Sequence, residues 1–201
     1  MPPTNVRDPK YFHKVVDCQW ACPAHTNVPE YIRLIAQGRF TDAYLLNRES
    51  NVFPGILGRT CDRPCEPACR RGRIEDQPVA ICRLKRVAAD HRDEEVVLAR
   101  IPQAPAQKNG KRIACIGAGP ASLTVANDLL PLGYEVTIFE KLPVPGGLMR
   151  SNIPASTLLI FTRNSALHCS SGSLGFEKMR VRGLSAPGSF GAAVKPWSVR
   201  A

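Results

Sequence analysis

The sequence lacks the features that mark membrane proteins and secreted proteins. No apolar run approaches the roughly 18 residues that a membrane-spanning helix needs. Residues 1–8, MPPTNVRD, contain no apolar segment of the kind found in a signal peptide. We therefore expect a cytoplasmic protein that does not associate with a membrane.

Aromatic residues are scarce, at 6% of the chain, and the net charge of +10 is unevenly distributed. Residues 151–201 hold six Lys/Arg and one acidic residue, a surplus of five, so half of the positive charge lies in the last quarter of the chain. No stretch interleaves basic and aromatic residues in the way that base-stacking proteins do. We expect no nucleic-acid partner.

Cysteine, in contrast, is abundant, with eight residues. Disulfides form in oxidising compartments, and the missing export signal argues against such a location. In a cytosolic protein, clustered cysteines more often bind metal or carry out redox chemistry. Six of them form the pattern Cys18-x3-Cys22, Cys61-x3-Cys65-x3-Cys69 and then Cys82.

This spacing favours a [4Fe–4S] cluster. Four thiolates must surround one compact centre, and closely spaced cysteines on a loop can converge if a second segment returns to complete the shell. Zinc is the first alternative, because His13 and His25 lie near the first cysteine pair. Free or disulfide-bonded cysteines are the second. Cys115 is expected to be an inert residue of a core strand, and Cys169 is given no role.

The first hundred residues are predicted to be mainly helical. Pro29 fits the first turn of a helix that ends at Gly38. One apolar stripe lies along that helix: Val28, Tyr31, Ile32 and Ile35. A second helix is expected to be capped by Thr41 or Asp42. Residues 51–75 are rich in turn formers and are expected to be irregular.

A third helix is predicted over residues 79–89, followed by a Pro/Ala-rich linker. A strand at 111–116, a helix at about 120–130 and a strand at 134–140 then form a βαβ unit with a parallel pair. Beyond it, the Ser/Gly-rich composition favours an unstructured tail, although 157–161 could be a strand.

The predicted fold class is therefore α + α/β. We divide the chain into a helical iron–sulfur domain (1–98), a linker (99–110), a partial Rossmann-type FAD-binding unit (111–155) and an atypical, unstructured tail (156–201).

A glycine-rich turn at the start of the βαβ helix points to a dinucleotide. Gly117 permits a tight turn, Gly119 lets the backbone approach a pyrophosphate, and Ser122 is small enough for close helix packing. Glu140 ends the second strand 23 residues after Gly117, where a carboxylate can accept hydrogen bonds from a ribose. The predicted cofactor contacts are Gly117, Gly119, Pro120, Ala121, Ser122, Glu140, Gly146 and Gly147.

Taken together, these features resemble the family of the small (beta) subunit of glutamate synthase. Its relatives include the N-terminal part of dihydropyrimidine dehydrogenase and FAD-dependent pyridine-nucleotide oxidoreductases. The resemblance covers about residues 4–154 and rests on Cys22-Pro23-Ala24, Val28-Pro29-Glu30-Tyr31-Ile32, Gly58-Arg59-Thr60-Cys61, Pro64-Cys65-Glu66-Pro67-Ala68-Cys69, Pro78-Val79-Ala80-Ile81, Leu84-Lys85-Arg86, Gly117 to Pro120 and Pro145-Gly146-Gly147-Leu148-Met149.

The resemblance implies that NAD(P)H reduces FAD and that electrons leave through iron–sulfur clusters to a larger redox subunit, such as the large subunit of glutamate synthase. Relatives with two clusters carry a further cysteine pair before the position of Cys18, which this chain lacks. By resemblance, Cys18 and Cys69 match two ligands of the cluster that has lost that pair. Only one cluster is therefore expected.

The remaining cluster has three ligands implied by the resemblance, Cys22, Cys61 and Cys65. Its fourth ligand should come from the start of the third helix, where Cys82 is the nearby candidate and competes with Cys69 and Cys18. Basic residues around these cysteines are expected to favour reduction of an anionic cluster or to face a partner, if they are not simply solvated.

After residue 154 the sequence departs from the family, since no second glycine fingerprint follows. The departure suggests a truncated or frame-disrupted form, or else a divergent extension. No nicotinamide site is visible, so hydride transfer from NAD(P)H is expected to be absent. We predict an electron-transfer oxidoreductase subunit. The alternatives are a non-catalytic iron–sulfur docking or electron-carrier module and a non-redox zinc module.

Overall fold

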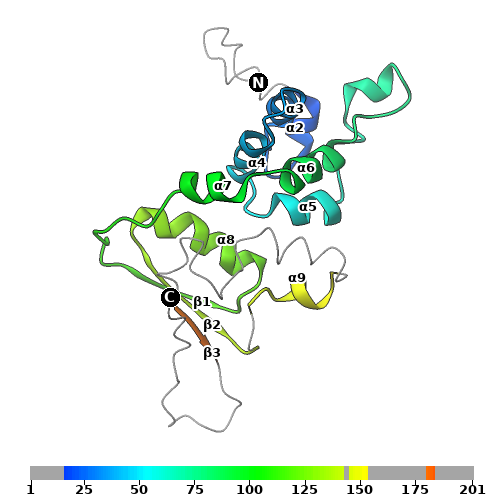
Figure 1. The fold of residues 1–201 in the computed structure, drawn as a ribbon. Helices are drawn as coiled ribbons and strands as arrows, with labels where there is room; N and C mark the ends of the chain where they lie inside the picture. The colour runs from blue at the N-terminus through cyan, green and yellow to red at the C-terminus, as the bar shows by residue number, and fades with distance from the viewer. Residues whose placement is uncertain (1–15, 143–144, 154–179, 184–201) are drawn as a thin grey trace, which may run out of the picture. The chain divides into compact units, whose positions relative to one another are not determined.

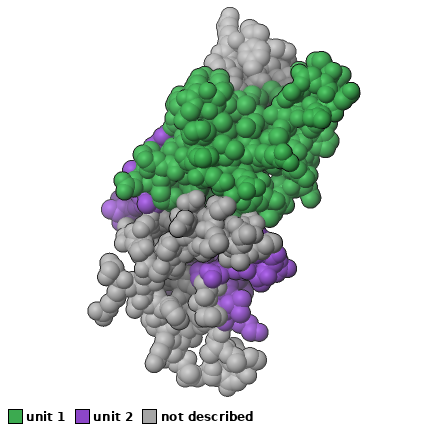
Figure 2. Space-filling view, turned by 45° about the vertical axis from the view of Figure 1, so that its right-hand side comes forward, with its two compact units in different colours: residues 1–97 green, residues 98–201 purple. Residues whose placement is uncertain are grey.

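The computed structural model describes residues 16–142, 145–153 and 180–183. The chain divides into two compact units, residues 1–97 and 98–201, which Figure 2 colours separately. None of the helices in the described ranges combines the length and the apolar character that crossing a membrane requires.

Helices make up the first unit, and a parallel sheet with helices makes up the second (Figure 1). The first unit contains α2 (Asp17–Ala21), α3 (Val28–Ala36), α4 (Phe40–Arg48), α5 (Pro54–Thr60), the 3₁₀ helix η1 (Arg70–Arg73) and α6 (Ile81–Asp90), and α7 (Glu94–Arg100) spans the division. The second unit contains β1 (Arg112–Ile116), α8 (Pro120–Leu129), η2 (Leu130–Leu132), β2 (Glu135–Glu140), α9 (Leu148–Ser151) and β3 (Arg180–Gly183). The predicted fold class is confirmed.

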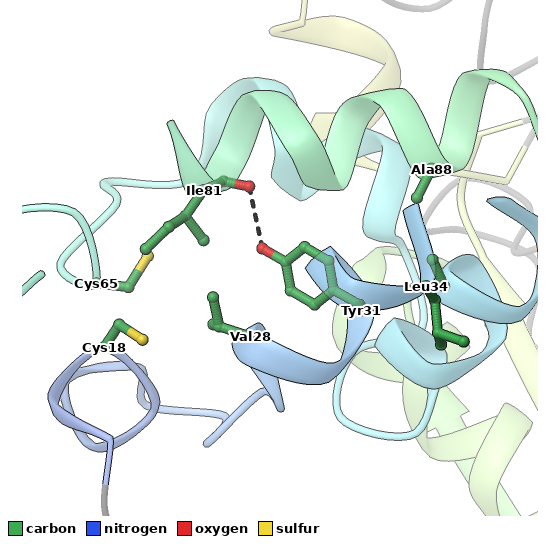
Figure 3. Packing of buried hydrophobic residues seen from close by; sticks show 8 residues of the cluster. Cys18, Val28, Tyr31, Leu34, Cys65, Ile81 and Ala88 are labelled. Atoms are coloured by element: carbon green, nitrogen blue, oxygen red, sulfur yellow. Dashed lines mark hydrogen bonds between the residues drawn. The ribbon is translucent and has the colours of Figure 1, made fainter. Parts of the chain in front are cut away.

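The core of the first unit forms where α3 and α6 meet. Tyr31 of α3 is fully buried there, and Ile81 of α6 is 1% exposed. The buried cluster, most of which Figure 3 labels, consists of Cys18, Val28, Tyr31, Leu34, Ala43, Cys65, Ile81 and Ala88. The predicted stripe on α3 is partly right, because Ile32 and Ile35 only pack against the edge of this cluster, while Leu34 faces inward.

Helix α5 corrects the prediction that residues 51–75 are irregular. Pro54 occupies its first turn, where the missing N–H is harmless. Its Gly58 lies so close to α6 that an added Cβ would come within 2.9 Å of the Arg86 backbone nitrogen. The Arg59 guanidinium donates to both carboxylate oxygens of Asp90 at 2.9 Å. Packing on α6 therefore holds this short helix in place.

The expected caps of α4 are also wrong. Arg39 is the N-cap residue, and no side chain caps this end by accepting a backbone N–H there. The Asp42 carboxylate instead accepts from Arg39 Nε at 2.7 Å. The Thr41 hydroxyl accepts the backbone N–H of Asp93 at 2.9 Å and so ties α4 to the segment before α7.

The second unit is a parallel sheet in the order β1-β2-β3. Alternate residues of β2 are buried, among them Val136 and Ile138, which are fully covered. Helix α8 connects β1 to β2 and packs against β2 (Figure 1), which confirms the predicted strand–helix–strand order. Strand β3 was not predicted; it lies within the expected tail, whereas the possible strand at 157–161 lies outside the described residues.

Candidate functional site

The first unit contains the six clustered cysteines. All seven cysteines that the structure describes are free thiols. Cys18, Cys65 and Cys82 are buried, and Cys22, Cys61 and Cys69 are half-buried. Cys115 is buried in β1 of the second unit, and Cys169 lies outside the described residues.

Cys65 and Cys82 are in direct contact. The Cys82 thiol donates a hydrogen bond to Cys65, which lowers the pKa of Cys65 to about 7 against the opposing effect of burial. The same bond, with burial and the nearby Cys61, raises the pKa of Cys82. Stabilisation of one thiolate by its neighbour makes this pair a soft, partly anionic donor set.

A carboxylate fixes the position of Cys82. Oε1 of Glu66 accepts the backbone N–H of Cys82 at 3.0 Å, across 16 residues of chain. The N-cap of α6 is Ala80, which has no side chain that could accept this hydrogen bond. Glu66 therefore caps α6 from outside the helix. Since Glu66 follows Cys65 directly, one capping contact brings both thiols to the same place.

The remaining thiols surround this pair. Burial raises the pKa of Cys18, and neighbouring Cys69 and Cys65 raise it further. Cys18 and Cys65 lie at one end of the buried cluster (Figure 3). Sγ of Cys61 accepts the N–H of Arg63 at 3.4 Å.

Cys22 approaches the same region from the segment after α2. Its Sγ donates to the hydroxyl of Thr26 at 3.6 Å. Burial raises the pKa of Tyr31, with added effects from Cys65, Cys82, Cys18 and Cys22, so cysteines from three segments lie near this one ring. Within the described ranges, however, no three His, Cys, Asp or Glu side chains come together closely enough to hold a metal ion.

The donor set nevertheless fits an iron–sulfur cluster in its chemistry. Thiolates are soft ligands that select zinc and iron–sulfur centres over hard cations. His25, the described candidate for a zinc ligand, makes other contacts: its Nδ1 lies 3.3 Å from the carbonyl oxygen of Gln19, and its ring lies edge-on to Trp20.

The second unit contains the glycine-rich turn. Gly117 follows β1 with φ +87°, a conformation that favours glycine. Gly119 is the N-cap residue of α8, and Pro120, Ala121 and Ser122 form the first turn of that helix. A Cβ added at Gly117 or Gly119 would meet no atom of the described residues within 4 Å. The described part of the chain therefore leaves room for a phosphate beside the helix N-terminus.

The Glu140 carboxylate holds the backbone of this turn in place through hydrogen bonds. Its Oε2 accepts the N–H of Ala118 at 2.6 Å, and its Oε1 accepts the N–H of Leu142 at 2.9 Å. Burial acts to raise the pKa of Glu140, but hydrogen bonds from the backbone N–H groups of Leu142, Ala118 and Lys141 hold it below its usual value. Sequence reasoning predicted a ribose contact for Glu140 and missed this role in fixing the turn.

The second pair of glycines folds back onto the first. The N–H of Gly146 donates to the carbonyl of Ala118 at 2.8 Å. Gly147 has φ +51°, and a Cβ there would come within 2.9 Å of the Gly119 Cα. Only glycine fits at position 147, because a side chain there would collide with the backbone of Gly119. The structure therefore brings the predicted cofactor residues of the second unit together around one turn.

Comparison with known families finds one match in each unit. Residues 12–97 match the family described as dihydropyrimidine dehydrogenase domain II, 4Fe–4S cluster. This match covers nearly the whole of the first unit. Residues 115–174 match a family of NAD(P)-binding Rossmann-like domains. The cysteine cluster and the glycine-rich turn each lie within one of these matches.

The similar proteins are oxidoreductase subunits. The chain is 40% identical to the beta subunit of NADP(+)-dependent formate dehydrogenase from Moorella thermoacetica, over 70% of this chain and 22% of that protein. It is 38% identical to the beta subunit of NADPH-Fe(3+) oxidoreductase from Geobacter sulfurreducens, over 75% and 23% respectively. It is 37% identical to the small chain of glutamate synthase [NADPH] from Mycobacterium tuberculosis, over 68% of this chain and 28% of that protein.

These matches confirm the resemblance to the glutamate synthase small subunit and to dihydropyrimidine dehydrogenase. The chain spans between 22% and 28% of the length of these three relatives. The similarity is therefore to a part of each relative, and the activity of those whole proteins is not carried over to this chain.

Proposed function

We propose that this chain passes electrons between a bound FAD and one [4Fe–4S] cluster, as part of an oxidoreductase related to the glutamate synthase small subunit. The contact between Cys65 and Cys82, fixed by Glu66, is the observation on which the proposal rests. It lies in a domain of a 4Fe–4S family. A [4Fe–4S] cluster supplies single-electron exchange, and FAD supplies hydride chemistry.

The proposed ligands are Cys22, Cys61, Cys65 and Cys82. The hydrogen bond between Cys65 and Cys82 supports Cys82 as the fourth ligand over Cys69 and Cys18. The nearby Cys69 raises the pKa of Cys18, which supports the idea that those two form a separate pair. In this arrangement, Glu66 orients Cys82 and the buried core excludes water.

The proposed FAD site is the turn at Gly117 and Gly119, with Pro120, Ala121, Ser122, Glu140, Gly146 and Gly147 around it. FAD and NAD(P) share an ADP half, so a Rossmann unit can receive the pyrophosphate of either. The flavin assignment follows from the resemblance to FAD-dependent relatives. We also propose that electrons leave to a larger redox subunit, as in the proteins whose names describe them as subunits.

Metal and sulfide analysis after anaerobic purification tests the cluster. We expect about four iron and four sulfide per chain, with the spectrum of a cubane cluster. Cys65→Ser and Cys82→Ser should each lose most of the iron. Cys115→Ser is the control, because Cys115 is buried in β1 of the second unit. Stoichiometric zinc without iron in the wild type would overturn the proposal.

A substitution at Gly119 tests the dinucleotide site. Its backbone, at φ −78° and ψ −177°, suits any residue, and an added Cβ meets no atom of the described residues within 4 Å. Gly119→Val should therefore fold normally but fill the space where a pyrophosphate would lie. Calorimetric titration should show FAD binding to the wild type and none to Gly119→Val. Binding of NADH or NADPH but not FAD would overturn the flavin assignment.

A further inference from the structure

Lys85 is a buried cation beside the paired thiols. It lies on α6 one turn after Cys82 and is only 6% exposed as a whole residue. A lysine usually buries its aliphatic stem and keeps its ammonium group in contact with water, and the stem of Lys85 is covered in this way. Its charge acts on both Cys65 and Cys82.

No carboxylate balances this charge within the described residues. Two carboxylates near this helix pair with arginines instead: Asp90 with Arg59 and Arg86, and Glu66 with Arg63. The groups that Lys85 does face are thiols. Because the protein covers most of this side chain and keeps water from one side of it, Lys85 can attract an anion that neutral thiols do not supply.

We infer that Lys85 is the counter-charge of the proposed iron–sulfur cluster and favours its reduced form. This inference rests on the proposed function. Four thiolates give a [4Fe–4S] centre a net negative charge, and reduction adds one more electron. A fixed positive charge close by in a poorly screened environment stabilises the more negative state. Lys85 thus raises the reduction potential of the centre from a single position on α6.

The exposed arginines of the same helix provide a matched control. Arg83 lies next to Cys82 in sequence but is exposed to solvent. Water and salt screen its charge, so its effect on a buried centre should be small. Lys85→Met removes the charge and keeps most of the side-chain volume. Lys85→Arg keeps the charge, and Arg83→Met removes a charge of the same sign from the surface.

The test is a redox titration of the purified protein, followed by electron paramagnetic resonance. We expect a more negative midpoint potential for Lys85→Met than for the wild type, with Lys85→Arg close to the wild type and Arg83→Met unchanged.

Equal potentials in Lys85→Met and Arg83→Met would overturn the inference. If Lys85→Met folds but retains no iron while Lys85→Arg retains it, the need for a counter-charge is supported. Loss of iron from both folded Lys85 variants would point to a steric role and also overturn the inference.

A second measurement does not need the loaded protein. After removal of iron with a chelator under reducing conditions, Lys85→Met should unfold at a higher urea concentration than the wild type, because an apolar side chain suits this largely covered position better than a cation that has lost the anion beside it. Equal or lower stability of the iron-free variant would contradict the inference. Absence of iron from the wild type would instead refute the proposed function itself, so the two failures are distinguishable.

Discussion

The hydroxyl of Tyr31 donates a hydrogen bond to the carbonyl oxygen of Ile81, 3.0 Å away and 50 residues further along the chain (Figure 3). The bond joins α3 to the first residue of α6, directly before Cys82. Tyr31 is fully buried, so water cannot replace it as a donor. This contact therefore helps to set where α6 begins relative to the helices before it.

Tyr31→Phe should destabilise the first unit by about 1 kcal/mol, because it removes one net hydrogen bond and keeps the ring. Urea unfolding followed by far-ultraviolet circular dichroism measures the change. Tyr134→Phe is the control, since that half-buried tyrosine makes no side-chain hydrogen bond within the described residues. If both variants lose the same stability, the bond to Ile81 contributes nothing specific.

Gly58→Ala should be clearly destabilising. The new methyl group would come within 2.9 Å of the Arg86 nitrogen and 3.1 Å of its Cα, and backbone atoms of a helix cannot move aside singly. Overpacking of this kind costs about 1–3 kcal/mol.

Gly55→Ala is the matched control on the same helix. Its Cβ would lie 3.4 Å from the Ala89 Cβ, an ordinary contact. Because alanine favours a helix more than glycine does, Gly55→Ala should be neutral or stabilising. Thermal unfolding of the two variants separates them, and equal melting temperatures would show that α5 does not approach α6 as described.

Periodicity and turn residues predicted the elements that have a strong local signal. Helix α3 and the βαβ unit follow from apolar spacing, from Pro29 and from the glycine-rich turn. Helix α5 was missed, because Pro54-Gly55 reads as a turn and the seven-residue helix is held mainly by its contact with α6. Its signal is tertiary and cannot be seen in a local window.

The cysteine spacing leads to a prediction of the cluster ligands, but it carries no signal of what positions Cys82. Glu66 caps Cys82 from 16 residues away, whereas a capping search looks only a few residues from the helix start. The burial of Lys85 was also not predictable, since a lysine in a basic stretch is typical of a solvated face.

Glu66→Ala should make the proposed cluster more labile. Without the carboxylate, the N–H of Cys82 loses its acceptor, and α6 is free to shift the thiol away from Cys65. We expect a shorter half-life of iron retention in air, measured by the decay of visible absorbance. Glu66→Gln keeps an acceptor oxygen and should stay close to the wild type. Glu75→Ala removes an exposed carboxylate that pairs with Arg71 and should have no effect; equal loss in Glu66→Ala and Glu75→Ala would contradict the capping role.

Glu140 should make the stability of the second unit depend on pH. Its carboxyl has a folded-state pKa below the ordinary value of 4.5, because backbone N–H groups stabilise the charged form. For a lowered pKa, the stabilising contribution is complete above the unfolded-state value and is lost as the pH falls through the folded-state value. The turn at Ala118 should therefore loosen under acidic conditions below about pH 4.5.

Glu140→Gln should remove most of this dependence, because the amide cannot ionise and accepts through only one oxygen. Hydrogen exchange of the β1 and β2 amides, corrected for its intrinsic pH dependence, measures the opening free energy of the unit between neutral and acidic pH. Glu135→Gln, at the start of β2 and paired with Lys108 at 3.6 Å, should keep the wild-type slope. A Glu140→Gln protein that loses protection in acid as steeply as the wild type would mean that another carboxyl controls the acid stability of the turn.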